Sequence, residues 1–193
     1  MAKSDSDSRK KGKPSKTKWI ITIFLLTIVI SAMISFCSAQ LMAASTMAVA
    51  FLILMVIVLV GIVFDIVGVA VTSADEKPFH SMAARKVIGA QEAIRLLRKA
   101  DKVSSICCDV IGDICGVVSG SASAAIVAQI VANPNLSLYQ QVISLAMSAL
   151  VAGATVGGKA IGKGFAIGSS TKIVHMVGKI IWSVTHIFEK KDR

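Results

Sequence analysis

The stretch STMAVAFLILMVIVLVGIVFDIVGVAVT, residues 45–72, decides the fold of this chain. It carries a single ionisable side chain, Asp65, among aliphatic neighbours. A helix needs about 20 apolar residues to cross the hydrocarbon core of a bilayer, so this stretch is long enough to span it. The whole chain, with 193 residues, 54% of them hydrophobic, and a mean hydropathy of +0.74, is too apolar for a water-soluble domain.

Further apolar runs lie on both sides of this stretch. Residues 19–38 are uncharged and longer than the ~7–15 residues of a signal-peptide core, so we interpret them as an uncleaved signal anchor rather than a cleaved signal peptide. Residues 103–131 predict a third span, which ends at an Asn-Pro-Asn turn. A fourth span begins near Val142, and several glycines blur its end. The predicted fold class is therefore an all-α integral membrane protein with three to four transmembrane helices.

The charges predict how these spans are oriented. All 21 Lys and Arg residues fall within residues 1–18, 75–102 and 159–193, whereas the short connections 38–44 and 132–141 carry no charge. Basic residues collect on the cytoplasmic side of membrane proteins, so both termini should be cytoplasmic in the cell membrane. We therefore expect the basic residues behind the net charge of +10 to bind anionic lipid head groups, and we expect no nucleic acid partner.

The three basic segments predict different structures. Residues 1–18 are rich in Ser and Lys and predict a disordered cytoplasmic tail. Residues 75–102 predict a juxtamembrane amphipathic helix on the cytoplasmic surface, or a helix that binds a soluble partner. Residues 171–193 predict a C-terminal helix that lies in the membrane interface. The apolar positions of the juxtamembrane helix recur at helical spacing, as do the polar positions of the last one; they are Val87, Ala90, Ile94 and Leu97, and Lys172, His175, Lys179, Ser183, His186 and Lys190.

Catalytic and cysteine motifs are missing from the sequence. No Ser, Cys or His constellation indicates nucleophilic catalysis, and the phosphate-binding loop G-x-x-x-x-G-K-[ST] does not occur, so an enzyme is not expected. The four cysteines, Cys37, Cys107, Cys108 and Cys115, lack the paired spacing of a zinc site, and we expect them to be small buried hydrophobic residues.

Three carboxylates within apolar runs are the candidate metal ligands: Asp65, Asp109 and Asp113. A charge at the bilayer centre costs about 2.5–3.5 kcal/mol, so such residues usually mark a cation site, a proton pathway or an ion pair. Asp109 and Asp113 lie four residues apart on one helical face, and Asp65 and Asp113 should lie at similar depth. The alternative is that the aspartates pair with Lys159 and Lys163 and only stabilise the bundle.

Glycines at four-residue spacing predict close helix packing. They are Gly112, Gly116 and Gly120 in the third span, and Gly153 and Gly157 in the fourth. This small-xxx-small pattern lets membrane helices approach each other closely. We expect packing within one chain, with a homodimer as the alternative.

Four segments together resemble a known family. FDIVGVAVTS (64–73), GAQEAIRLLRKADKV (89–103), DVIGDICG (109–116) and GKAIGKGFAI (158–167) are similar in order and spacing to the transmembrane domain of the cyclin-M and CorB/CorC magnesium and cobalt transporters. The resemblance implies a core over residues 45–170 with three spans and a cytoplasmic belt, usually dimeric, that holds Mg²⁺ or Co²⁺ in the membrane. It also implies that the span at 19–38 is an addition and that the family's cytoplasmic CBS domains are not in this chain.

The chain departs from the family at the cation site. Asp65 stands at a serine of the family pattern and Asp113 at an asparagine, whereas Gly68 and Lys159 replace two glutamates. We therefore hypothesise that the Lys159 ammonium is a tethered cation in the place of Mg²⁺; the alternative is that it extends to the cytoplasmic interface. The expected function is divalent-cation transport or binding, with a non-transporting scaffold or regulator and a proton-coupled carrier as rivals.

Overall fold

The computed structural model describes residues 16–43, 46–132 and 137–191, and within these ranges every element is helical. Residues 1–15 of the expected disordered tail lie outside these ranges, and Lys16, Thr17 and Lys18, which were expected in that tail, belong to the first helix. The elements in chain order are α1 (Lys16–Ala43), α2 (Met47–Ser73), α3 (Lys77–Ala84), α4 (Ala90–Leu97), α5 (Ala100–Ser104), the π-helix η1 (Ser105–Ile111), α6 (Gly112–Val131), the 3₁₀ turn η2 (Ser137–Tyr139), α7 (Gln140–Gly168) and α8 (Ser170–Lys191).

Four helices in the described part of the chain are long and apolar enough to cross a membrane: α1, α2, the continuous helix Ala100–Val131 and α7. They leave large apolar side chains exposed along their lengths; Phe36, Met55, Leu145 and Ile161 are each 66% exposed or more. Monomeric water-soluble proteins rarely expose this much apolar surface. The expected all-α fold is confirmed within the described residues, and where three to four spans were expected there are four helices of sufficient length and hydropathy.

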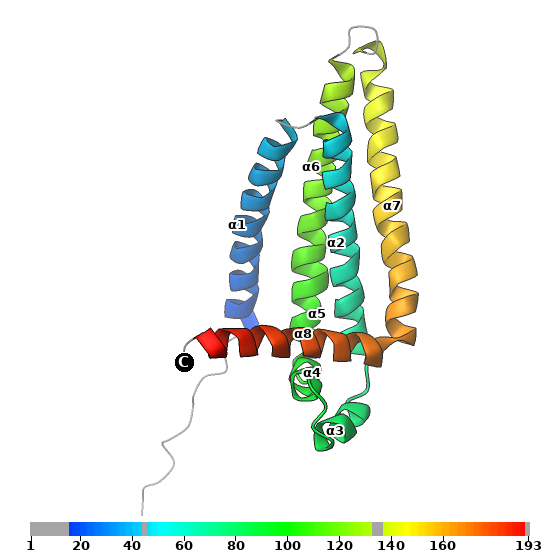
Figure 1. Cartoon of the computed structure of the whole chain (residues 1–193). Coiled ribbons are helices and arrows are strands. Elements are labelled where there is room, and N and C mark those ends of the chain that lie inside the picture. Colours follow the sequence, from blue (N-terminus) through cyan, green and yellow to red (C-terminus); the bar gives the residue numbers. More distant parts are fainter. Residues whose placement is uncertain (1–15, 44–45, 133–136, 192–193) are drawn as a thin grey trace, which may run out of the picture.

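Helix α2 is the centre of the bundle and contacts both α6 and α7 (Figure 1). Ala50 and Leu54 of α2 pack with Ile126 of α6 and Val151 of α7 in one buried cluster. Helix α1 packs mainly on α6, and its Ile23 and Ile30 pack against a buried cluster formed by Val110, Ile114 and Val118. Because α2 touches both neighbours, a side chain on its inner face can meet groups from two other helices.

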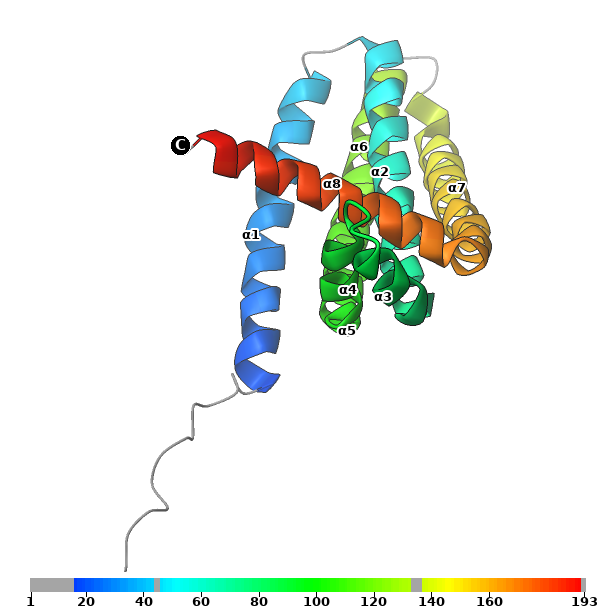
Figure 2. The same ribbon diagram turned by 60° about the horizontal axis from the view of Figure 1, so that its bottom comes forward.

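Helix α8 runs across the base of the bundle, transverse to the long helices (Figure 1 and Figure 2). Its Val174 is fully buried in a cluster with Val71 of α2, Phe79 of α3 and Ala166 of α7. This cluster anchors the short helices α3 and α4 and the start of α8 to the long ones. The helix expected over residues 171–193 is therefore present, with one buried side.

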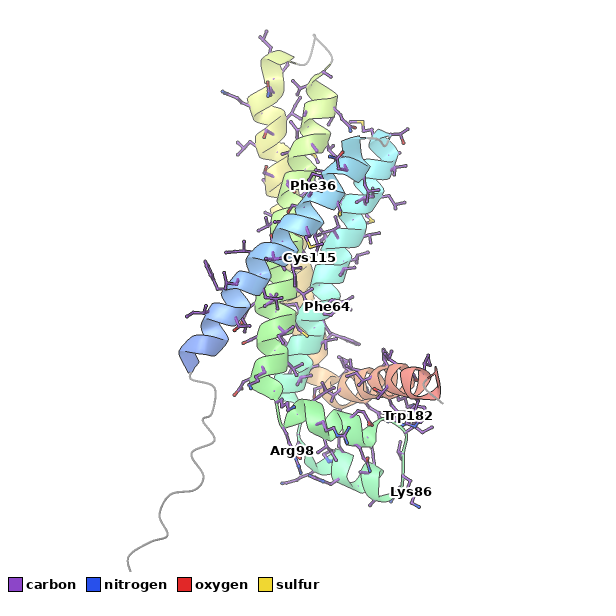
Figure 3. All side chains as sticks on the ribbon, turned by 90° about the vertical axis from the view of Figure 1, so that its left-hand side faces the viewer. Phe36, Phe64, Lys86, Arg98, Cys115 and Trp182 are labelled. Atoms are coloured by element: carbon purple, nitrogen blue, oxygen red, sulfur yellow. The ribbon has the colours of Figure 1, made fainter. Side chains whose placement is uncertain are left out.

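The segment 75–102 is not the single helix we expected. It forms α3, a turn, and α4, because Lys86 and Gly89 adopt left-handed backbone conformations with φ of 56° and 83°. Ile94 and Leu97 pack against the cluster at the base, as expected, whereas Val87 falls in the turn and is 36% exposed. Figure 3 shows Lys86 at the far end of this segment.

Gly89 is required at this turn for a second reason. A Cβ on Gly89 would lie 2.6 Å from the backbone nitrogen of Lys179, and one on Gly178 would collide with the carbonyl oxygen of Gly89. Only glycine at both positions lets the backbones of the turn and α8 touch. The ion pair between Arg98 Nε and Glu76 Oε1, at 3.1 Å, ties the other end of the segment together.

The glycines predicted to pack helices are mostly not those that do. Of the five, only Gly112 has a close neighbour; Cβ atoms on Gly116, Gly120, Gly153 and Gly157 would meet nothing within 4 Å in the described chain. The helices approach instead at other glycines: Gly61, Gly68, Gly158 and Gly162. In α7 the packing glycines, Gly158 and Gly162, are also four residues apart and face Ile62 and Ile66 of α2, so the spacing alone does not tell which glycines of α7 face another helix.

Candidate functional site

An ion pair between α2 and α7 forms the centre of the candidate site. Lys159 Nζ lies 3.8 Å from Asp65 Oδ1, and the two side chains are 23% and 7% exposed. The tethered-cation hypothesis requires Lys159 Nζ to lie within ion-pair distance of Asp65 or Asp113, and the contact with Asp65 meets this requirement. It suits an ion pair but exceeds the usual length of a hydrogen bond. The second carboxylate oxygen, Oδ2, is buried and has no hydrogen-bond partner in the described part of the chain.

Besides α2 and α7, the continuous helix Ala100–Val131, which contains the π turn, borders the site. A Cβ on Gly112 would lie 3.3 Å from Lys159 Nζ and 3.5 Å from the carbonyl oxygen of Cys107, so the absence of a side chain leaves room for the ammonium. The Cys108 thiol donates a long, weak hydrogen bond of 3.7 Å to the backbone oxygen of Asp65. On α2, Gly68 lets the π segment approach, because a Cβ there would collide with Cys108 Sγ.

The three candidate metal ligands do not come together. Asp65 is 5% exposed inside the bundle, whereas Asp109 and Asp113 are exposed on the outer face of their helix. In residues 16–43, 46–132 and 137–191, no group of three or more His, Cys, Asp or Glu side chains could hold a metal ion. The seven-residue π-helix Ser105–Ile111 lies between α5 and α6; it contains Asp109 and ends two residues before Asp113, so an α-helical wheel does not describe their relative positions.

The other candidate residues stand apart from this pair. Lys163, one turn beyond Lys159, is exposed and forms no ion pair with a described residue. Of the cysteines, Cys107 is buried, Cys108 and Cys115 are half-buried, and Cys37 is exposed, contrary to expectation. The π turn and the contact of Gly68 with Cys108 were not predicted, because the sequence holds no recognisable signal for either.

The chemistry open to this arrangement is electrostatic. A buried carboxylate and an ammonium from different helices compensate each other, and breaking such a pair leaves an uncompensated charge. The site can hold a cation beside Asp65, and Lys159 already supplies one. No known protein family, curated protein or solved structure matches the chain, so its function is argued from this geometry and from the sequence.

Proposed function

We propose that the chain is an integral membrane protein that crosses the cell membrane four times, with both termini in the cytoplasm. The support is the four long apolar helices with large exposed apolar side chains. The two connections at one end of the bundle, which join α1 to α2 and α6 to α7, carry no charge. The basic residues of α3 and α4 and those of α8 lie at the other end, which in this proposal faces the cytoplasm.

Within the membrane, we propose a divergent CorB/CorC-type protein that does not transport: a scaffold or regulator in which the Lys159 ammonium takes the place of the cation. The observation that carries this proposal is the 3.8 Å distance between Lys159 Nζ and Asp65 Oδ1. A Mg²⁺ ion at the same carboxylate would need about six oxygen ligands, and it would be repelled by the ammonium. One buried carboxylate is a poor divalent site while Lys159 is present.

The depth of Lys159 supports this role over a simple extension to the interface. It lies nine residues before the end of α7 at Gly168, roughly 14 Å at 1.5 Å per residue, which is about half of a ~30 Å hydrocarbon core. Its Nζ also turns toward Gly112 and Asp65 inside the bundle. An ammonium at this depth is disfavoured unless it is paired, and Asp65 supplies the pair.

One observation favours divalent-cation binding or transport as a second candidate. Asp65 Oδ2 is buried without a described partner, so the carboxylate has free capacity to bind a cation such as Mg²⁺ or Co²⁺. Lys159 would have to swing away from Asp65 first. Its side chain is 23% exposed, so it is not enclosed by the bundle.

The test compares the purified parent chain with Lys159→Ala. Mg²⁺ binding is measured by calorimetry in detergent, and Mg²⁺ uptake by a trapped indicator dye in vesicles. If Lys159 stands in for the cation, the parent shows neither binding nor uptake and Lys159→Ala gains Mg²⁺ binding. Lys163→Ala is the matched control, since it removes an exposed lysine one turn away and should not change binding.

Two results decide against this proposal. Mg²⁺ uptake by the parent chain would favour the transporter, and a Lys159→Ala variant that binds no more Mg²⁺ than the parent would remove the tethered-cation role. The double variant Asp65→Asn with Lys159→Ala must lose whatever binding Lys159→Ala gains. If it does not, the ion binds somewhere other than Asp65.

A further inference from the structure

A groove runs between α6 and α7, and Gly116 and Gly120 of α6 line it. One hollow in it has a volume of about 250 Å³ and is lined mainly by small and hydroxyl side chains: Gly116, Ser119, Gly120, Ser123, Ser148, Val151, Ala152, Thr155 and Val156. A second hollow of about 560 Å³ continues from it along the first turns of α7 and is lined by α7 residues alone: Gln140, Gln141, Ser144, Leu145 and Ser148. Ser148 lines both hollows, so together they extend from the beginning of α7 to Thr155.

The groove ends one helical turn from the ion pair on both of its helices. On α6, Gly116 lines the groove, and Gly112, one turn away on the same face, lies against Lys159 Nζ. On α7, Thr155 lines the groove, and Lys159 follows one turn later. The polar residues of α7 recur at spacings of 3, 4, 7 and 4, as Gln141, Ser144, Ser148, Thr155 and Lys159, and so share one face.

Hydroxyl groups alone do not require water in this groove. Ser119 and Ser123 are each 3% exposed and donate hydrogen bonds to the carbonyl oxygens of Gly116 and Gly120, at 2.9 and 2.8 Å. Thr155 donates to Val151 O at 2.8 Å. Hydroxyls satisfied in this way within their own helix are tolerated in lipid.

Three other groups are not satisfied by their own helix. The Lys159 ammonium has three N–H donors, and none makes a hydrogen bond with a described residue. Asp65 Oδ2 is buried without a partner in the same part of the chain, and the exposed Ser148 hydroxyl also makes no hydrogen bond there. Polar and charged groups kept from water without partners are strongly disfavoured, and ordered water usually supplies what the protein does not.

We propose that the α6–α7 groove is an aqueous passage from the beginning of α7 to the Asp65–Lys159 pair, holding water and open to small hydrophilic cations. Each water takes about 30 Å³ in the liquid, so the hollows have room for several. The passage hydrates the ammonium from the end of the bundle opposite α8. The inference rests on the proposed function only in requiring that the chain spans a bilayer; it does not require that Lys159 replaces Mg²⁺.

The test uses thiol reactivity in vesicles that contain the full chain with its four native cysteines replaced by alanine. Single cysteines are then introduced at Ser148 and Thr155 in the groove and at Ala146 and Leu150, which flank the depth of Ser148 on the opposite face of α7. The reagent is a positively charged methanethiosulfonate that does not cross lipid. The cysteine thiolate attacks its sulfur, forms a mixed disulfide and releases methanesulfinate.

An aqueous passage gives reaction at Ser148→Cys and Thr155→Cys at least about tenfold faster than at Ala146→Cys and Leu150→Cys, because thiol reaction requires access to water. Prior Mg²⁺ at millimolar concentration should slow the Thr155→Cys reaction more in a Lys159→Ala background than in the parent. Each cysteine variant must also elute as the parent does in detergent, so that slow reaction is not a result of misfolding.

Three outcomes overturn the passage. Equal, slow reaction on both faces means that lipid fills the groove, and rapid oxidation of Ser148→Cys to a disulfide-linked pair of chains means that a second copy covers it. Equal, fast reaction at all four positions instead means that α7 does not cross the bilayer, which would overturn the proposed function as well. Fast reaction confined to the groove, without Mg²⁺ binding by Lys159→Ala, leaves the passage in place and removes the tethered cation.

Discussion

Gly112 of α6 leaves the space in which the ammonium of Lys159 on α7 lies: a Cβ at position 112 would be 3.3 Å from Nζ. The contact is tight but concerns the far end of a flexible side chain, which can move by a few tenths of an ångström. Gly178 of α8 is different, because a Cβ there would meet the backbone oxygen of Gly89 and lie 3.1 Å from the backbone nitrogen of Ala93. Backbone atoms have no comparable freedom to move.

The glycine contacts predict a clear order of tolerance to alanine. Gly112→Ala should change the free energy of unfolding by less than about 1 kcal/mol, since only Nζ must shift. Gly178→Ala should lower it by about 1–3 kcal/mol, since α8 must move off the turn at Gly89. Denaturant titration in detergent measures both, and hydrogen exchange should show faster exchange in α8 of Gly178→Ala.

Gly153→Ala is the matched control for these two variants. Gly153 lies within α7, and a Cβ there meets nothing within 4 Å in the described chain. Alanine should therefore be neutral or stabilising by about 0.5–1 kcal/mol, through helix propensity. A Gly178→Ala variant as stable as Gly153→Ala would contradict the close approach of α8 to the turn.

Breaking the Asp65–Lys159 pair should cost more than removing both charges. Asp65→Asn or Lys159→Met alone leaves an uncompensated charge in the bundle, and each should lower the free energy of unfolding by about 3–5 kcal/mol. The double variant replaces both charges with neutral groups and should lose clearly less than the sum. The measurement is a double-mutant cycle on denaturant unfolding in detergent.

Two exposed charged residues, Asp113 on α6 and Lys163 on α7, provide the control cycle. Asp113→Asn and Lys163→Met remove a carboxylate and an ammonium that form no ion pair in the described part of the chain. Each should stay within about 0.5 kcal/mol of the parent, and the pair should be additive. Additive effects for Asp65 and Lys159 would mean that their 3.8 Å separation contributes nothing to stability.

The helices could be predicted from the sequence because they depend on local patterns. Apolar length marked all four long helices, and the spacing of Ile94 and Leu97 correctly placed both against the base of the bundle. The break between α3 and α4 was missed because Lys86 adopts a left-handed conformation that its residue type does not signal. Gly89, which shares that conformation, was treated as part of the helix.

The site was predicted in part, for a similar reason. Asp65 and Lys159 were singled out because charges in apolar runs are rare, and a pairing of the two was one of the alternatives. Asp109 and Asp113 were assigned to the same site from α-helical spacing and depth, whereas Asp113 follows a π segment and both side chains are exposed. Which face of a helix turns inward is decided by contacts with other helices, and one sequence does not contain them.

The proposed topology predicts where an added cysteine can be labelled from outside intact cells. Asn135 lies in the uncharged connection between α6 and α7, outside the described residues, and Asn135→Cys in a chain without native cysteines should react with an impermeant maleimide. Lys86→Cys, exposed in the turn between α3 and α4, should react only after the membrane is permeabilised. The reverse pattern would invert the orientation.

Helix α8 should lie with one face in lipid and the other in water. Its exposed apolar side chains, Met176, Ile180, Val184 and Ile187, recur at spacings of 4, 4 and 3, and Lys179 is exposed beside them (Figure 3 shows Trp182 on the same helix). In vesicles, a spin label at Ile180→Cys should be relaxed mainly by oxygen, which concentrates in lipid, and one at Lys179→Cys mainly by a water-soluble nickel complex. The two positions are adjacent, so a difference between them reports which face of α8 each label lies on, and not its position along the helix.

Val174, fully buried among α2, α3 and α7, gives the reference, because a label there should be shielded from both reagents if it is accommodated at all. Equal relaxation by the nickel complex at positions 179 and 180 would place α8 in water on both faces and remove it from the membrane interface.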